Sequence, residues 1–244
     1  MSQGVEWFEE WFDTPYYHML YSKHDLDEAM TFTKNLVSKI KLPIDARILD
    51  LGCGKGRHSI YLNQQGYSVV GLDLSCKSIA SAKEFERPDL SFSQGDMRQE
   101  FGTEEYDLIL NLFTSFGYFK TSEEHIPVLE NVHRALKPGG RFVLDFFNSE
   151  VLRKDEGDHS LEMEGVKFTF SKRYESDRVV KQIHIIDGAE KHQFKEEVLT
   201  WSVSELRHLL ESCGLKIINT YGSYLLDSFD HRNSERIIFC AQKS

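Results

Sequence analysis

Between residues 46 and 148, short apolar stretches alternate with amphipathic segments. The apolar stretches are nearly continuous, which is typical of strands buried on both faces of a parallel sheet. The segments between them, around residues 57–65, 76–85 and 122–135, space their apolar residues as helices do. We therefore predict an α/β domain with helices on both faces of its sheet. The predicted strands cover residues 47–51, 68–72, 90–94, 106–112 and 141–146.

The pattern changes after Asn148. Residues 151–200 contain alternating stretches, such as 167–171 and 179–186, with polar breaks between them, which predicts a small antiparallel β meander. A helix with a capping box of Ser202 and Glu205 follows, and two more strands are expected over 215–221 and 236–241. We expect one domain built from residues 1–150 and 201–244, with residues 151–200 inserted into it. The insertion either covers a substrate cleft, which we favour, or forms a dimer contact.

The N-terminal part is rich in aromatic residues. A helix is expected over residues 24–40, with Asp25 and Glu28 as its capping box. The residues before it either pack onto the domain or form a lid over a ligand. The aromatic residues concerned are Trp7, Phe8, Trp11, Phe12, Tyr16, Tyr17 and Tyr21.

Composition narrows the possible partners. The 244 residues, 40% of them hydrophobic, suffice for one buried core and an appendage. A formal charge of −10 without a basic cluster argues against nucleic acid. No apolar run reaches the roughly 18–20 residues of a membrane span, and the N-terminus resembles no secretory signal. The 4 cysteines are scattered, so we expect a cytoplasmic protein without a metal site or disulfides.

The most informative motif runs from Ile48 to Gly56, where an apolar strand enters a glycine-rich turn and then a helix. Glycines there let a ligand approach the backbone closely, at a sheet edge where ligands commonly bind. A dinucleotide fingerprint would have a glycine where Arg57 stands. Asp50 would repel a diphosphate but can pair with a ligand ammonium group. The motif therefore favours an amino-acid-bearing ligand over a dinucleotide.

Acidic residues also follow the next two strands. Asp73, at the tip of the second strand, can accept hydrogen bonds from both hydroxyls of a ribose. Asp96 can accept from an adenine amino group, and Met97 can lie against the ring. Each feature alone has an ordinary explanation, since an acidic strand tip also suits NAD and Gly-Asp pairs are common in turns.

Together, the segments Asp50–Gly56, Asp73, Asp96–Met97, Asp107–Ile109 and Leu136–Arg141 closely resemble class I methyltransferases that use S-adenosylmethionine (SAM). The resemblance spans residues 44–148. It implies a Rossmann-like, mostly parallel seven-stranded sheet, SAM as cofactor and S-adenosylhomocysteine (SAH) as product. It makes Leu136–Gly140 a structural turn. The implied cofactor-binding residues are Asp50, Gly52, Cys53, Gly54, Asp73, Leu74, Asp96, Met97, Asn111, Leu112 and Phe113.

The aromatic tract 113–118 and the β insertion resemble a subgroup that includes glycine and amino-sugar N-methyltransferase-like proteins. Aromatic faces can attract the positive charge of an amine. For any single aromatic candidate, ordinary core packing is the favoured interpretation. The candidates for the substrate pocket are Tyr17, Tyr21, Phe116, Tyr118 and Phe147.

Few polar residues can be assigned a catalytic role, and we name no catalytic residue. His58 can be a base or a surface residue at a helix start, and we favour the surface. His18, His24 and His125 are expected to be solvated. Asp145 and Asn148 either touch substrate or end their strand.

We predict a SAM-dependent methyltransferase that acts on N or O of a small-molecule acceptor, as a monomer or homodimer. The alternatives are a non-catalytic SAM-binding or interaction module and, less favoured, an NAD-dependent dehydrogenase. Methyl transfer needs no obligatory nucleophile from the protein, so the sequence alone does not separate the enzyme from the module.

Overall fold

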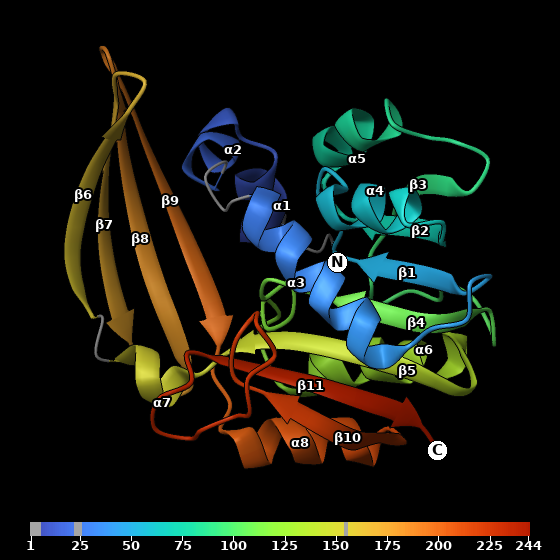
Figure 1. Cartoon of the computed structure of the whole chain (residues 1–244). Coiled ribbons are helices and arrows are strands. Elements are labelled where there is room, and N and C mark those ends of the chain that lie inside the picture. Colours follow the sequence, from blue (N-terminus) through green and yellow to red (C-terminus); the bar gives the residue numbers. More distant parts are fainter. Residues whose placement is uncertain (1–5, 22–25, 154–155) are drawn as a thin grey trace, which may run out of the picture.

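A seven-stranded sheet forms the centre of the molecule (Figure 1). The computed structural model describes residues 6–21, 26–153 and 156–244. The strands β1 to β5 pair in parallel, and β11 runs antiparallel to both β5 and β10. In spatial order they are β10 (Leu215–Tyr221), β11 (Arg236–Lys243), β5 (Leu136–Phe147), β4 (Tyr106–Asn111), β1 (Arg47–Leu51), β2 (Ser68–Asp73) and β3 (Leu90–Gln94).

The strand order reverses at β1, which pairs with β2 on one side and β4 on the other. In open α/β sheets such a switch point opens a crevice at the carboxyl ends of the strands, where ligands bind. The fold therefore directs attention to the residues just after β1, β2, β3 and β4.

Helices cover both faces of this sheet. One buried core joins it to α3 (Leu26–Ile40), α4 (Arg57–Gln64) and α5 (Cys76–Lys83), through residues such as Phe32, Leu62 and Ile79. A second core joins it to α6 (Ile126–Ala135) and α8 (Val203–Ser212), through residues such as Val128 and Leu206. None of the helices in the described ranges is long and apolar enough to cross a membrane.

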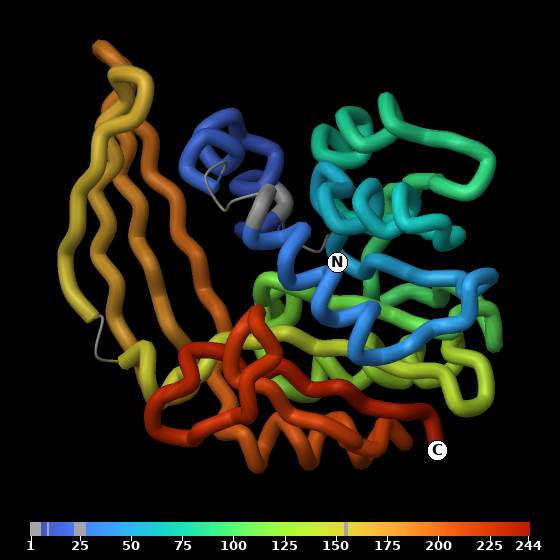
Figure 2. The backbone as a smooth tube through the Cα atoms, in the orientation of Figure 1, coloured from blue at the N-terminus to red at the C-terminus, as the bar shows by residue number. Residues whose placement is uncertain are grey.

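A separate four-stranded antiparallel sheet stands beside the first, as the backbone trace in Figure 2 shows. Two short helices, α1 (Trp7–Phe12) and α2 (Pro15–Tyr21), lie between the two sheets. Trp11 is fully buried in a third core with Phe168 and Ile183. The chain enters the second sheet through α7 (Ser149–Leu152), and the strands are β6 (Gly157–Met163), β7 (Val166–Tyr174), β8 (Arg178–Asp187) and β9 (Glu190–Leu199).

The predicted fold class is confirmed, with local differences. The segment expected to be a turn before β5 is part of the strand, because Leu136 already pairs with Tyr106 of β4. The helix expected over 122–135 begins with a short 3₁₀ turn, η1 (Glu123–His125), and Pro127 then occupies the first turn of α6, where its missing N–H is tolerated. The capping box of Ser202 and Glu205 is confirmed. Asp25, of the other predicted box, lies outside the described residues.

Candidate active site

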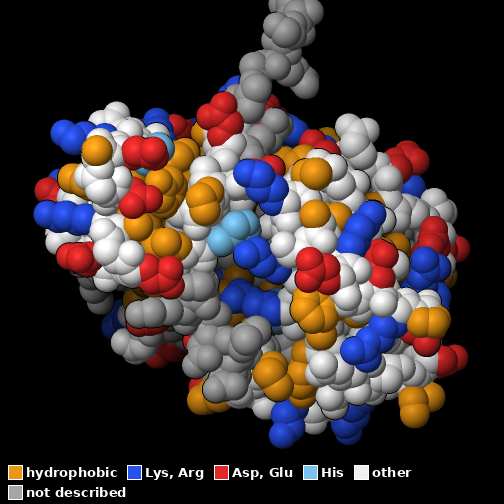
Figure 3. Space-filling model, turned by 90° about the horizontal axis from the view of Figure 1, so that it is seen from above, with side chains coloured by type: hydrophobic (Ala, Val, Ile, Leu, Met, Phe, Trp, Pro, Cys, Tyr) orange, Lys and Arg blue, Asp and Glu red, His pale blue; other side chains and the backbone are white. Residues whose placement is uncertain are grey.

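A cavity of about 920 Å³ lies where the carboxyl ends of β1 to β4 face the second sheet. Side chains of α1 and α2 form part of its wall, and so do residues of β7, β8 and β9. Figure 3 shows the molecule hollowed between its two sheets, with basic side chains at the hollow. A cavity of this size can hold one nucleoside-sized ligand together with a second small molecule.

The bend after β1 brings bare backbone to the cavity. Gly54 has φ +55°, and a Cβ added to it would have no atom within 4 Å, so its backbone faces open space. Gly52 has φ +81°, and its added Cβ would lie 2.6 Å from the Cβ of Ser115. Side chains rarely adopt this left-handed conformation. The two positions therefore require glycine, and they leave a cradle that a ligand can enter.

Asp50 lies beneath this bend. Its side chain is 1% exposed and accepts a hydrogen bond of 2.6 Å from Ser59 Oγ. Burial raises the pKa of the Asp50 carboxyl to about 6. No ion pair within the described part of the chain includes Asp50, so a ligand ammonium group would supply the charge that this carboxylate lacks.

Asp73 ends β2 and is held by two backbone amides. Gly54 N–H donates to Oδ2 and Ser75 N–H donates to Oδ1, each at 2.8 Å. These bonds stabilise the ionised form, while burial acts more strongly and raises the pKa of Asp73. The carboxylate keeps lone pairs that can accept from a diol in the cavity.

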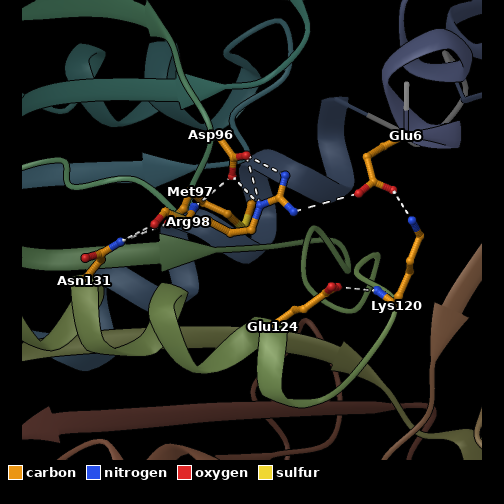
Figure 4. Close-up of polar contacts among 7 residues, drawn as sticks. All are labelled: Glu6, Asp96, Met97, Arg98, Lys120, Glu124 and Asn131. Atoms are coloured by element: carbon orange, nitrogen blue, oxygen red, sulfur yellow. Dashed lines mark hydrogen bonds and ion pairs between the residues drawn. The ribbon is translucent and has the colours of Figure 1, made fainter. Parts of the chain in front are cut away.

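Asp96 follows β3 and is engaged by Arg98, as Figure 4 shows. The Arg98 guanidinium donates to both carboxylate oxygens: Nη2 lies 2.6 Å from Oδ2, and Nε lies 2.9 Å from Oδ2 and 3.1 Å from Oδ1. Arg98 also approaches Glu6, at the start of α1, at 4.0 Å. Asn131 Nδ2 donates to the carbonyls of Arg98 and Gln99, which fixes the turn after Asp96.

The turn after β4 is strained and is held from behind. Phe113 and Thr114 have φ of 55° and 61°, which costs roughly 1–2 kcal/mol for each residue with a side chain. Phe113 N–H donates to Asp145 Oδ2 at 2.8 Å, and Arg236 Nη2 donates to Thr114 Oγ1 at 2.9 Å. Arg236 and the fully buried Asp145 form an ion pair at 2.7 Å. Asp145 of β5 and Arg236 of β11 thus hold the turn whose residues Phe113 and Thr114 line the cavity.

His58 is buried beside this turn, so the prediction of a surface residue was wrong. Its Nδ1 lies 2.8 Å from Thr33 Oγ1, and Arg57 Nε donates to its Nε2 at 3.3 Å. Burial, with Arg57 adding to the effect, lowers the pKa of His58 to about 3. The imidazole is neutral at physiological pH and has no free nitrogen with which to act as a base.

The opposite wall of the cavity is built from tyrosines and one acidic residue. Tyr17 and Tyr21 come from α2, and Tyr118 comes from the loop after β4. Burial, with the charge of Glu196 adding to it, raises the pKa of Tyr17, and burial likewise raises the pKa of Tyr118. Glu196 of β9 accepts hydrogen bonds of 2.7 Å from Trp11 Nε1 and from Tyr21 Oη. We call Tyr17, Tyr21, Tyr118 and Glu196 the tyrosine chamber.

The structure brings most of the predicted site residues together. Of the eleven proposed for the cofactor, Asn111 does not line the cavity, because it is fully buried and donates to the Leu51 carbonyl at 2.8 Å. Of the five proposed for the substrate, Phe116 does not line it, because it packs in the core against His125 and Trp201. The predicted residues that do line it are Asp50, Gly52, Cys53, Gly54, Tyr17, Tyr21, Asp73, Leu74, Asp96, Met97, Leu112, Phe113, Tyr118 and Phe147.

Several polar residues differ from their expected places. His125 is fully buried, not solvated. His24 lies outside the described residues. Asp145 supports the turn after β4, and Asn148 caps α7 by accepting from Glu150 N–H at 3.2 Å. Sequence reasoning gave no role to Arg57, Lys181, Glu196, Tyr224 and Arg236, which all line the cavity.

The residues present fit SAM. Asp50 offers a buried carboxylate to the ammonium of its methionine part, Gly54 leaves open space above the bend, and Asp73 offers a carboxylate to the ribose hydroxyls. Met97 and Leu74 border the place left for adenine. This donor set suits a cationic amino-acid nucleoside better than a diphosphate, which would meet three carboxylates.

Comparison with known proteins identifies the family. Residues 48–140 match the model described as "Methyltransferase domain". A putative methyltransferase, YqeM of Bacillus subtilis (strain 168), is 31% identical over 215 residues, which are 83% of this chain and 86% of that protein. The chain belongs to the SAM-dependent methyltransferases.

Two further proteins are similar to this methyltransferase. A SAM-dependent methyltransferase from Clostridium acetobutylicum ATCC 824 has the same fold, with a TM-score of 0.79, 20% identity, and coverage of 93% of this chain and 95% of that one. The dTDP-3-amino-3,4,6-trideoxy-α-D-glucopyranose N,N-dimethyltransferase of Streptomyces venezuelae is 30% identical over 126 residues, 47% of this methyltransferase and 53% of the relative. The Rossmann-like fold is thereby confirmed.

Proposed function

We propose that this methyltransferase transfers a methyl group from SAM to the nitrogen of a small-molecule amine. The observation that carries the proposal is the continuity of the cavity. One space is lined by Asp50 and Asp73 at the glycine bend and by the tyrosine chamber on the other side. Bound SAM supplies a methyl group on a sulfonium, which needs no further activation.

The residues of the chain then have three tasks. Asp50, Asp73 and the glycine bend hold the cofactor in place. The tyrosine chamber holds the acceptor in line with the methyl group, and such orientation can contribute about 7–11 kcal/mol. The faces of Tyr17 and Tyr118 stabilise the positive charge that an amine gains on methylation, by roughly 0.5–2 kcal/mol. The helices α1 and α2 cover the space and exclude water.

An amine is a better candidate than a hydroxyl because a hydroxyl nucleophile usually needs a base. Among the described histidines, His18 and His58 line the cavity. Burial lowers the pKa of both, which makes them weak bases. The tyrosine hydroxyls of the chamber stay protonated because burial raises their pKa. An amine can instead bind in its neutral form. The relative that methylates an amino-sugar nitrogen is consistent with this choice.

We assign residues 1–150 and 201–244 to the catalytic domain, and residues 151–200 to an insertion that completes the acceptor wall. The support is that Lys181, Glu196 and Val198 of the insertion line the same cavity as Asp73. A dimer contact remains the alternative role of the insertion.

The proposal is tested by incubating the full chain with labelled SAM and matched sets of small amines, phenols and carboxylic acids. We expect methyl transfer to amines, above all to primary and secondary amines on a polar ring. Transfer to phenols or carboxylic acids without transfer to any amine would contradict the choice of nitrogen. Tight SAH binding without transfer to any acceptor would favour a binding module.

A further inference from the structure

The methionine part of SAM carries a carboxylate as well as an ammonium group, and both are attached to the same carbon atom. With the ammonium group at Asp50, the ligand carboxylate must lie nearby, where the like charge of Asp50 repels it. A cation beside the glycine bend would remove this conflict. Among the described residues of the bend and of the first turn of α4, the cations that line the cavity are Lys55 and Arg57.

Arg57 is held in place from two sides. Its Nε donates to His58 Nε2 at 3.3 Å, and its guanidinium lies over the ring of Phe113, 4.3 Å from the ring centroid. Phe113 in turn stacks on Tyr224, with ring centroids 4.9 Å apart. Arg57 lines the cavity and is partly exposed there. The guanidinium is therefore fixed in orientation and still reachable by a ligand.

The buried His58 is arranged to accept from Arg57. Thr33 Oγ1 donates its only proton to the Ala29 carbonyl at 2.7 Å, so at its contact of 2.8 Å with His58 Nδ1 it can only accept. Nδ1 therefore carries the proton of the neutral ring, and Nε2 is left as the acceptor for Arg57 Nε. This buried histidine, which the methyl transfer does not use, thus orients the guanidinium.

The first turn of α4 brings Arg57 and Asp50 to the same bend. Ser59, two positions after Arg57, donates to Asp50 Oδ2 at 2.6 Å. The turn after β4, on which the guanidinium rests, is also joined to the bend, because Ser115 Oγ donates to the Gly52 carbonyl at 3.4 Å. One negative and one positive side chain therefore border the glycine bend.

We propose that Arg57 is a cofactor-binding residue whose guanidinium pairs with the carboxylate of the methionine part of SAM or SAH. A guanidinium suits a carboxylate because its parallel N–H donors can bind both oxygens. The inference rests on the placement of the ammonium group at Asp50. It gives the site one charge of each sign for the two charges of an amino acid, and it gives a role to the arginine that stands where a dinucleotide fingerprint has glycine.

Calorimetric titration of the wild-type chain with two ligands tests the proposal without any substitution. One ligand is SAH, and the other is its decarboxylated analogue, S-adenosyl-3-thiopropylamine, which keeps the nucleoside, the sulfur and the ammonium group. We expect the analogue to bind about 10- to 150-fold more weakly, the usual effect of losing hydrogen bonds to a charged group. Equal affinities for the two ligands would overturn the proposal.

Arg57→Met then locates the partner of the carboxylate. It keeps an unbranched side chain over Phe113 but no charge, so it should bind SAH about 10- to 150-fold more weakly and the analogue at least as well as the wild type does. Arg57→Lys keeps the charge without the planar donors and should recover part of the SAH affinity. The matched control is Lys55→Met, which removes a cation from the same bend and should keep the wild-type preference for SAH.

The pattern of losses separates the proposal from its alternatives. Equal weakening of both ligands by Arg57→Met would show a damaged site and not a lost carboxylate contact, and it would overturn the proposal. Loss of the preference for SAH in Lys55→Met instead of Arg57→Met would overturn it as well. A wild-type chain that binds neither ligand would contradict the placement of the cofactor itself.

Discussion

The two sides of the cavity are held together in different ways. On the side where we propose that the cofactor binds, called the cofactor side, polar contacts join residues close in sequence: Asp50 and Ser59 are 9 positions apart, and Asp73 and Gly54 are 19 apart. On the opposite side, formed by α1, α2 and the second sheet and proposed to hold the acceptor, contacts join distant segments: Trp11 and Glu196 are 185 positions apart, and Tyr16 and Asp187 are 171 apart. We call it the acceptor side.

The difference shows how each side acquires its function. The carboxylates of Asp50 and Asp73 are placed by strand ends and held by groups within 20 positions along the chain. The acceptor wall exists only when α1, α2 and the second sheet pack together. We therefore expect substitutions on the cofactor side to change affinity for SAM and SAH, and substitutions on the acceptor side to change turnover.

The largest effect is expected at the Asp145–Arg236 ion pair, which supports the turn after β4. The Asp145 side chain is 0% exposed and that of Arg236 19%. Asp145→Ala leaves a nearly buried guanidinium without its partner and should lower the free energy of unfolding by about 3–5 kcal/mol in urea denaturation. The control is Asp158→Ala, which removes an exposed pair with Arg173 at 2.8 Å and should change the free energy of unfolding far less, because solvent screens exposed charges. Equal losses of unfolding free energy in the two variants would contradict the structural role of the Asp145–Arg236 ion pair.

A smaller effect is expected at Asp73. Asp73→Ala removes hydrogen bonds of a charged acceptor, so SAH affinity should fall by about 1.5–3 kcal/mol, or roughly 10- to 150-fold. Calorimetry measures the change, with Asp89→Ala, an exposed acidic residue before β3, as the control. Unchanged affinity in Asp73→Ala would remove the ribose assignment.

Replacing the aromatic wall should affect turnover instead. Tyr118→Ala or Tyr17→Ala should lower kcat by about 2- to 30-fold, corresponding to roughly 0.5–2 kcal/mol of lost charge stabilisation. The affinity for SAH should change little. Tyr118→Phe retains the ring face and should keep most of the turnover. Normal kcat in both alanine variants would show that the chamber does not hold the acceptor.

The pH dependence of SAH binding should depend on Asp50. In the folded protein the pKa of Asp50 is about 6, above its ordinary value of 3.8. The protonated carboxyl therefore stabilises the fold fully below about pH 3.8, and this stabilisation is lost as the pH rises through about 6. Binding of the SAH ammonium group runs the other way, since this group pairs with the ionised carboxylate. SAH affinity should fall by up to about tenfold between pH 7 and pH 5. The burial-raised pKa of Asp73 acts in the same direction, and Asp50→Asn should flatten the profile.

The sequence allowed the cofactor side to be predicted because its signals are local. The strand, the glycine bend and the acidic residue after each strand lie next to one another along the chain. The structure places Asp50, Gly54, Asp73 and Met97 on one cavity as expected. Asn111, proposed for the same side, does not line the cavity because its side chain donates to the Leu51 carbonyl.

The acceptor side was predicted less completely because its contacts join segments that are far apart along the chain. The aromatic residues of the N-terminal segment were recognised, but nothing local to Glu196 or Lys181 indicates that β8 and β9 turn these side chains to the cavity. His58 was misjudged because burial depends on neighbours elsewhere in the chain, here Thr33. The sequence likewise could not separate a pocket role for Phe116 from core packing, and the structure places its ring against Trp201.

The most direct test of the central claim is a crystal structure of the full chain with SAH. We predict the ammonium group near Asp50, the ribose on Asp73, and the sulfur facing the space between Tyr17 and Tyr118. SAH bound elsewhere, or bound with its sulfur turned away from the tyrosine chamber, would contradict the account.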